Sequence, residues 1–183
     1  MPQSPSSSIL SVSLIMLFLC ATLQASGPQN GSSASEAVLV PEDEPGVPLV
    51  VSGTVYLADG KTPVAGARLY VYHTDNEGHY SKGGVDESKR RLNATLITDA
   101  QGRYRLRTIR PAPYPGQGPP AHIHFELTPP GGTTQYLEIW FDDDPKLSEA
   151  MRRRYADKTS FGHIMTLTMD AQGTWHCTKD FRV

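Results

Sequence analysis

Residues 103–109 read Arg-Tyr-Arg-Leu-Arg-Thr-Ile, and the alternation of Arg with Tyr104, Leu106 and Thr108 is typical of a half-buried β-strand. A turn of sequence Asp-Ala-Gln-Gly precedes this strand at 99–102. After it, residues 111–120 contain five prolines, so this stretch cannot lie inside a sheet. Further strands are predicted at 121–128 and 135–141. The centre of the chain therefore consists of short strands joined by turns and one stiff loop.

The same pattern extends from Leu49 to the C-terminus. Residues 67–73 alternate between aliphatic and Tyr side chains, and 16 Gly and 15 Pro are scattered through the chain as turn residues. Lys146 to Tyr155 is the one helical candidate, with Pro145 placed to open it. Residues 163–169 and 174–181 are predicted to form a closing hairpin. We therefore predict an all-β fold over 49–183, a β-sandwich of about seven to nine strands with one short helix near the C-terminal third.

The first 48 residues differ from the rest. Residues 9–23 form a mostly apolar run that is too short to span a membrane, and we interpret 1–25 as a signal peptide. Residues 26–48 are rich in Ser, Pro, Gly and acid, and are predicted to be a flexible arm. We expect a secreted or periplasmic protein with no membrane association after cleavage. Cys177 would then be the only thiol, which excludes an internal disulfide.

Length and charge restrict the possible partners. The 183 residues fit one domain, and the formal net charge of -2 offers no basic surface to nucleic acid. The oligomeric state cannot be predicted from these features.

The candidate metal ligands begin with His122 and His124. Residues i and i+2 of a strand share a face, so the two imidazoles can chelate one ion. Taken alone, the pair fits a solvated strand face better than a metal site. Tyr114 lies between two prolines that stiffen its loop, and Tyr80 follows the turn 76–78. Two phenolates and two imidazoles together would suit ferric iron, although the residue types do not exclude zinc.

Three stretches carry a resemblance to a known family: residues 72–80 read YHTDNEGHY, residues 108–115 read TIRPAPYP and residues 120–125 read PAHIHF. Over roughly residues 50–145 the chain resembles the intradiol ring-cleavage dioxygenases. The resemblance implies Fe(3+) held by Tyr80, Tyr114, His122 and His124. It also implies that Tyr114 is an axial ligand displaced by a catechol-type substrate, whose ring is cleaved between its hydroxyls with O2 to a muconate-type diacid.

Two positions depart from the family pattern. The family carries an Arg three residues before the first His, where this chain has Pro119, and a Gln on the following strand, where we align Glu138. Arg103, Arg105, Arg107 or Arg110 could replace the missing charge, but their alternation favours a solvated face. Residues 89–91, Lys-Arg-Arg, are a second basic group that could rim a pocket.

Two other functions stay open. Residues 53–68 resemble the opening hairpin of transthyretin-like modules, so a non-catalytic sandwich that binds iron, catecholates or a partner is one alternative. A zinc hydrolase is the other, with the His pair and either Glu126 or Glu138 as the third functional group.

Overall fold

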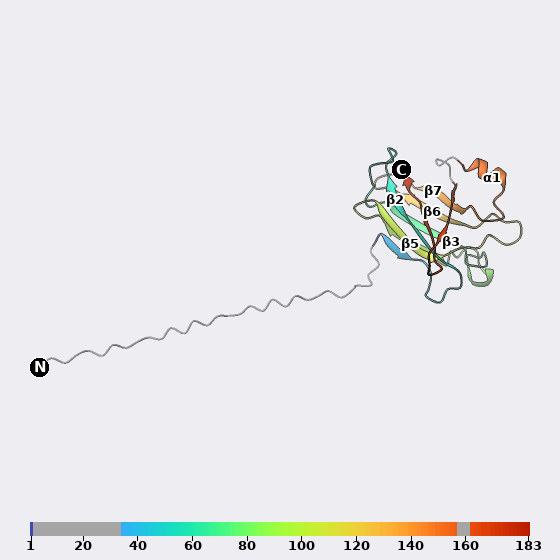
Figure 1. Cartoon of the computed structure of the whole chain (residues 1–183), viewed down its shortest axis with the longest axis horizontal. Coiled ribbons are helices and arrows are strands. Elements are labelled where there is room, and N and C mark those ends of the chain that lie inside the picture. The colour runs from blue at the N-terminus through green and yellow to red at the C-terminus, as the bar shows by residue number, and fades with distance from the viewer. Residues whose placement is uncertain (2–33, 157–161) are drawn as a thin grey trace. The chain divides into compact units, whose positions relative to one another are not determined.

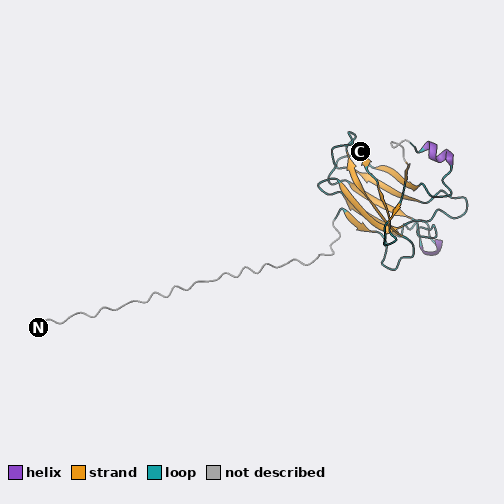
Figure 2. Cartoon of the chain, viewed as in Figure 1, coloured by secondary structure: helices purple, strands orange, loops and turns teal. Residues whose placement is uncertain are grey.

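Two β-sheets contain most of the regular secondary structure in the described residues. The computed structural model describes Met1 and residues 34–156 and 162–183, in which strands dominate and one short α-helix lies to the side (Figure 1, Figure 2). Apart from Met1, the predicted signal peptide 1–25 and residues 26–33 of the predicted arm lie outside the described residues. The predicted all-β sandwich with one short helix is confirmed.

The first sheet has six strands in the order β1-β5-β2-β10-β9, with β11 pairing with β2. Its central pair is antiparallel and places Val51 opposite Leu106. β10 and β11 both run parallel to β2. The strand bounds are β1 Glu36–Val38, β2 Pro48–Tyr56, β5 Arg103–Ile109, β9 Thr168–Met169, β10 Trp175–Thr178 and β11 Phe181–Arg182.

The second sheet has five strands in the order β4-β3-β6-β7-β8. Its first four strands are antiparallel neighbours, and β8 is added parallel to β7. The strand bounds are β3 Arg68–His73, β4 Leu92–Ile97, β6 His122–Thr128, β7 Gln135–Phe141 and β8 Gly162–Met165. A 3-10 turn, η1 (Lys82–Gly84), lies in the loop between β3 and β4.

The hydrophobic core lies between the two sheets. Ile123, Phe125 and Leu127 of β6 point into it and are almost fully buried, as are Val51 and Leu106 of the first sheet. Because side chains alternate along a strand, His122 and His124 lie on the other face of β6, away from the core. A slip of one residue in the β6 register would exchange these faces. The same register that builds the core therefore presents the two histidines outward.

Part of the predicted flexible arm belongs to the sandwich. Residues 26–48 were expected to lie outside the domain, but Glu36–Val38 forms β1, which pairs parallel with β5, and Leu39 is buried. Glu44 accepts a hydrogen bond of 2.8 Å from Arg91. The side-chain composition did not predict this strand, because a three-residue edge strand is held mainly by backbone hydrogen bonds and needs no particular side-chain pattern.

The helix and the C-terminal strands also differ from expectation. The helix α1 covers only Glu149–Arg154 and begins at Ser148, whose hydroxyl accepts a hydrogen bond from the Met151 amide, so Pro145 does not open it. Residues 163–169 were predicted to be one strand, but they divide between β8 and β9, which belong to different sheets. Only β9 and β10 form the hairpin. No helix in the described residues is long and apolar enough to cross a membrane.

A buried histidine makes the stability of the fold depend on pH. Nδ1 of His73 donates to the carbonyl of Thr74 at 2.6 Å and Nε2 accepts from the Thr108 hydroxyl at 2.5 Å, so the ring is neutral. Burial lowers the pKa of His73 to about 4 from the usual 6.5. Between pH 6.5 and pH 4 this histidine is protonated in the unfolded chain but neutral in the folded chain, so the free energy of unfolding falls as pH falls.

We predict that the lowered pKa of His73 reduces the free energy of unfolding by about 2.5 kcal/mol when the pH falls from 7.5 to 4.5. Urea denaturation of wild type and His73→Gln at both pH values would measure this effect. The variant should lose less stability on acidification by about that amount. An identical pH dependence in both proteins would contradict the assignment.

Candidate metal centre

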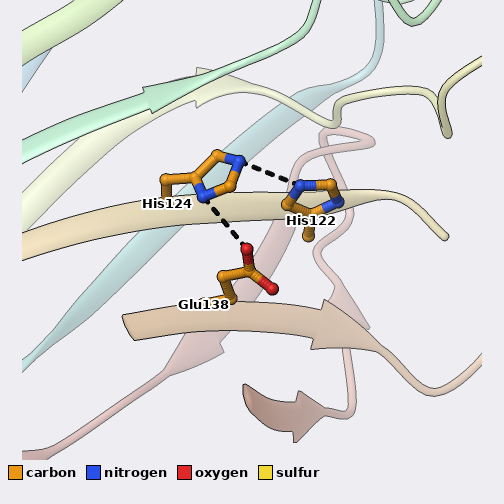
Figure 3. A group of neighbouring side chains, drawn as sticks. All are labelled: His122, His124 and Glu138. Atoms are coloured by element: carbon orange, nitrogen blue, oxygen red, sulfur yellow. Dashed lines mark hydrogen bonds and ion pairs between the residues drawn. The ribbon is translucent and has the colours of Figure 1, made fainter. Parts of the chain in front are cut away.

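The two outward histidines of β6 face each other through their Nε2 atoms, which are 2.9 Å apart (Figure 3). The Nδ1 atom of each ring has a partner of its own. Nδ1 of His122 donates to the carbonyl of Pro120 at 2.7 Å, and Nδ1 of His124 lies 3.1 Å from a carboxylate oxygen of Glu138. With a proton on each Nδ1, both Nε2 lone pairs point into the same space. Such an arrangement is typical of imidazoles oriented to ligate a metal.

Two phenols complete this cluster. The hydroxyl of Tyr80 lies 2.9 Å from Nε2 of His124 and is within hydrogen-bond contact of the hydroxyl of Tyr114. The rings of Tyr114 and His122 are 5.1 Å apart. The structure therefore brings together all four residues singled out in the sequence. Two come from one strand and two from separate loops.

The Tyr80 loop is packed directly against the Tyr114 loop. Asp75 holds the turn, because one of its carboxylate oxygens accepts hydrogen bonds from the amides of Glu77 and His79. Gly78 adopts a φ of +90°, and a Cβ atom there would lie 2.3 Å from the carbonyl oxygen of Pro113. Only glycine permits this close approach. The turn and the proline-rich loop thus meet where the two tyrosines must converge.

Burial sets the protonation states of the ligand atoms. Burial raises the pKa of the Tyr80 and Tyr114 phenols, and the hydrogen bond to Tyr114 raises that of Tyr80 further. Burial lowers the pKa of His122, which keeps its imidazole neutral. Neutral imidazoles are ready to ligate, whereas the phenols need a nearby cation to lose their protons. The donor set therefore fits a hard, highly charged cation.

Glu138 contacts the His124 ring on the side away from the four converging ligand atoms. Ligating atoms of His122, His124 and Glu138 all lie within 4.8 Å of one another. However, the carboxylate contacts Nδ1 of His124, on the far side of the ring from Nε2, and its second oxygen accepts from the Trp140 indole at 2.9 Å. Burial is the largest single effect on the Glu138 pKa and raises it, but the hydrogen bonds with His124 and Trp140 and the charges of the two histidines together outweigh burial, so the pKa lies below its usual value. Glu138 is thus placed to orient His124, which disfavours a zinc site built from two His and this Glu.

A cavity of about 670 Å³ opens beside the four residues. Its lining consists of Tyr70, Tyr72, Tyr80, Glu87, Ser88, Arg90, Tyr114 and His124. The Tyr72 ring stacks on the His124 ring, with 4.5 Å between ring centres. The Arg90 guanidinium lies 3.8 Å from the centre of the Tyr72 ring and 3.3 Å from Glu126. Both oxygens of Glu87 are engaged by His79 and the Tyr80 amide.

The arginines proposed from the sequence have different roles. Arg103, Arg105 and Arg107 belong to β5 in the opposite sheet, and Arg110 pairs with Asp143 at 2.6 Å. From the basic group 89–91, Arg90 lines the cavity. Nothing in the sequence marked Arg90 above its neighbours, because its position depends on the fold of the loop. Tyr72 could have been identified, since the alternation in 67–73 puts it on the face shared with His124.

Comparison with known proteins identifies the family of this chain. A sequence model of the family described as dioxygenase matches residues 26–179. Catechol 1,2-dioxygenase 2 of Acinetobacter lwoffii is 35% identical over 120 residues, and chlorocatechol 1,2-dioxygenase of Pseudomonas sp. strain P51 is 36% identical over 125 residues. The chain belongs to the intradiol ring-cleavage dioxygenase family. These alignments cover 57% and 56% of this chain but 43% and 49% of the relatives, so the chain spans about half of their length.

Solved structures of dioxygenases share the fold. The dioxygenase domain of a carbohydrate-binding fusion protein from Streptomyces sp. SirexAA-E aligns with a TM-score of 0.63 and 29% identity, over 87% of this chain and 95% of that domain. Catechol 1,2-dioxygenase from Pseudomonas arvilla C-1 aligns with a TM-score of 0.65 and 29% identity, over 81% of this chain and 55% of the enzyme.

The orientation of Glu138 predicts which substitutions abolish metal binding. His122→Ala removes an Nε2 donor and should leave the purified protein with little iron after loading and desalting. Glu138→Gln keeps a hydrogen-bond acceptor behind His124, so we expect retained iron with an affinity about tenfold weaker. Elemental analysis and chelator competition would measure both effects. Complete loss of iron in Glu138→Gln would show that this carboxylate is itself a ligand.

Proposed function

We propose that this protein is an Fe(III)-dependent dioxygenase that cleaves a catechol-type ring between its two hydroxyls with O2 and yields a muconate-type diacid. The observation that carries the proposal is the convergence of two tyrosine oxygens and two histidine Nε2 atoms beside a cavity that Tyr80, Tyr114 and His124 line. Relatives named as catechol, chlorocatechol and hydroxyquinol 1,2-dioxygenases support the substrate class.

Iron dependence is a property of the family, and the residues present fit the ferric state. Tyr80, Tyr114, His122 and His124 would hold the ion, because two phenolates supply the anionic oxygen donors that a trivalent cation favours. When bound, ferric iron supplies an electron-withdrawing centre that makes a catechol ring reactive toward O2. The protein contributes binding, orientation and proton transfer.

Tyr114 is suited to take a proton from the substrate. Burial raises the pKa of its phenol, so a deprotonated Tyr114 would be a strong base toward a catechol hydroxyl. A catechol hydroxyl that enters from the cavity can give its proton to this oxygen. The hydroxyl of Tyr80 is in hydrogen-bond contact with that of Tyr114 and can orient the protonated phenol.

Arg90 provides the positive charge that the sequence lacks at Pro119. It lines the cavity together with Tyr80, Tyr114 and His124, and it is held in place by the Tyr72 ring and Glu126. A guanidinium at this position can stabilise negative charge that develops on the ring, and its partial exposure makes the effect smaller than that of a fully buried donor.

The proposal is tested by oxygen consumption of the iron-loaded protein with catechol, followed by product analysis. We expect uptake of one O2 per catechol, a diacid product, and loss of both in His122→Ala. If the iron-loaded protein binds catechol but consumes no O2, the enzymatic proposal is wrong and a non-catalytic catecholate-binding sandwich takes its place.

The role of Arg90 is tested with two neighbouring charge removals. We predict that Arg90→Gln lowers kcat/KM for catechol by about tenfold, whereas Lys89→Gln leaves it unchanged. Lys89 is the matched control because it pairs with Asp86 and is absent from the cavity lining. Equal kinetics in both variants would exclude Arg90 from the reaction.

We also propose that the protein works outside the cytoplasm. The apolar run 9–23 supports export. Removal of this run would also remove Cys20 and leave Cys177 as the single cysteine of residues 26–183. Cys177 is free and buried, and burial raises its thiol pKa to about 12, which makes it unreactive.

A further inference from the structure

The connection from β7 to α1 (Figure 1) contacts the proline-rich loop at its start, middle and end. At the start, the Arg110 guanidinium donates two hydrogen bonds to the Asp143 carboxylate, at 2.6 and 2.7 Å. Such a two-point pair fixes orientation as well as distance. Both side chains are partly exposed, so this pair positions the loop entrance more than it stabilises the fold.

At the end of the loop, Asp144 links Ala121, the residue before β6, to the same connection. Its side chain is buried, and one oxygen accepts from the Ala121 amide at 2.7 Å while the other accepts from the Lys146 amide at 2.8 Å. Ala121 directly precedes His122. A buried carboxylate with two charge-assisted hydrogen bonds is a rigid link, so the position of His122 is coupled to that of Lys146.

In the middle, the Lys146 side chain reaches the segment that carries Tyr114. Its ammonium group lies 2.6 Å from the carbonyl oxygen of Tyr114, 2.9 Å from that of Gly116 and 3.5 Å from that of Gly118. An ammonium has three protons to donate, and three carbonyls surround it. This part of the loop contains prolines and glycines, so backbone hydrogen bonds within the loop are few and the lysine supplies what they lack.

We propose that Lys146 is a positioning residue for Tyr114, and that Lys146 and Asp144 together form a brace that sets the separation between Tyr114 and His122. The inference rests on the proposed function in so far as Tyr114 leaves and returns during turnover. With its backbone held by Lys146, Tyr114 moves by side-chain rotation alone, and the loop does not drift away. The brace acts through the Tyr114 backbone and does not touch the substrate.

The first test uses the iron-free protein, so it does not depend on the proposed reaction. Hydrogen exchange of peptides covering 112–118 should be about tenfold faster in Lys146→Met than in wild type, and peptides from β2 should be unchanged. Lys61→Met is the matched control, since it removes the same charge from the exposed turn after β2. Unchanged exchange in 112–118 would overturn the proposal. If Lys146→Met does not fold, Lys146→Gln keeps two N–H donors and serves in its place.

The second test separates positioning from mere stabilisation in the iron-loaded protein. We expect Lys146→Met to weaken the visible absorption of iron-bound tyrosinate and to lower kcat by at least about tenfold, with partial recovery in Lys146→Arg. A variant with faster exchange but wild-type absorption and kcat would show a structural role only and would overturn the proposal. If wild type itself shows no tyrosinate absorption, the proposed function fails, while the exchange result still decides whether Lys146 holds the loop.

Discussion

The opposed Nε2 atoms of His122 and His124 are the constraint on which the rest of the site depends. Each ring is oriented by its Nδ1–H, which donates to the Pro120 carbonyl in His122 and faces the Glu138 carboxylate in His124. The two Nε2 atoms are 2.9 Å apart, and their lone pairs repel each other unless a cation or a proton lies between them. The register of β6 creates this arrangement, because the same strand fills the core with Ile123 and Phe125.

The two tyrosines reach this point because two loops are held against each other. Gly78 allows the Tyr80 turn to approach the backbone of Pro113, and Lys146 holds the Tyr114 segment from the other direction. Neither loop contributes a regular element at the site. The precision comes from carbonyl, carboxylate and ammonium contacts, which hold the two loops in place.

Much of the fold and part of the site could be predicted from the sequence. Alternation predicted β3, β5 and β6, and the spacing of His122 and His124 placed both on one face. The loop positions of Tyr80 and Tyr114 made them candidates, but a tyrosine in a loop says little by itself, and it was the family resemblance that implied both as ligands. The pairing of β1, the position of Arg90 and the contacts of Lys146 depend on residues distant in sequence, and no local pattern encodes them.

We propose that both tyrosines bind ferric iron together with the two histidines. The most direct measurement is the visible absorption spectrum of the iron-loaded protein, recorded before and after addition of catechol without oxygen. We expect a red-brown tyrosinate band that weakens in Tyr80→Phe and, in wild type, shifts to longer wavelength with catechol. A colourless protein at full iron loading would contradict it, because the tyrosines could then not be ligands.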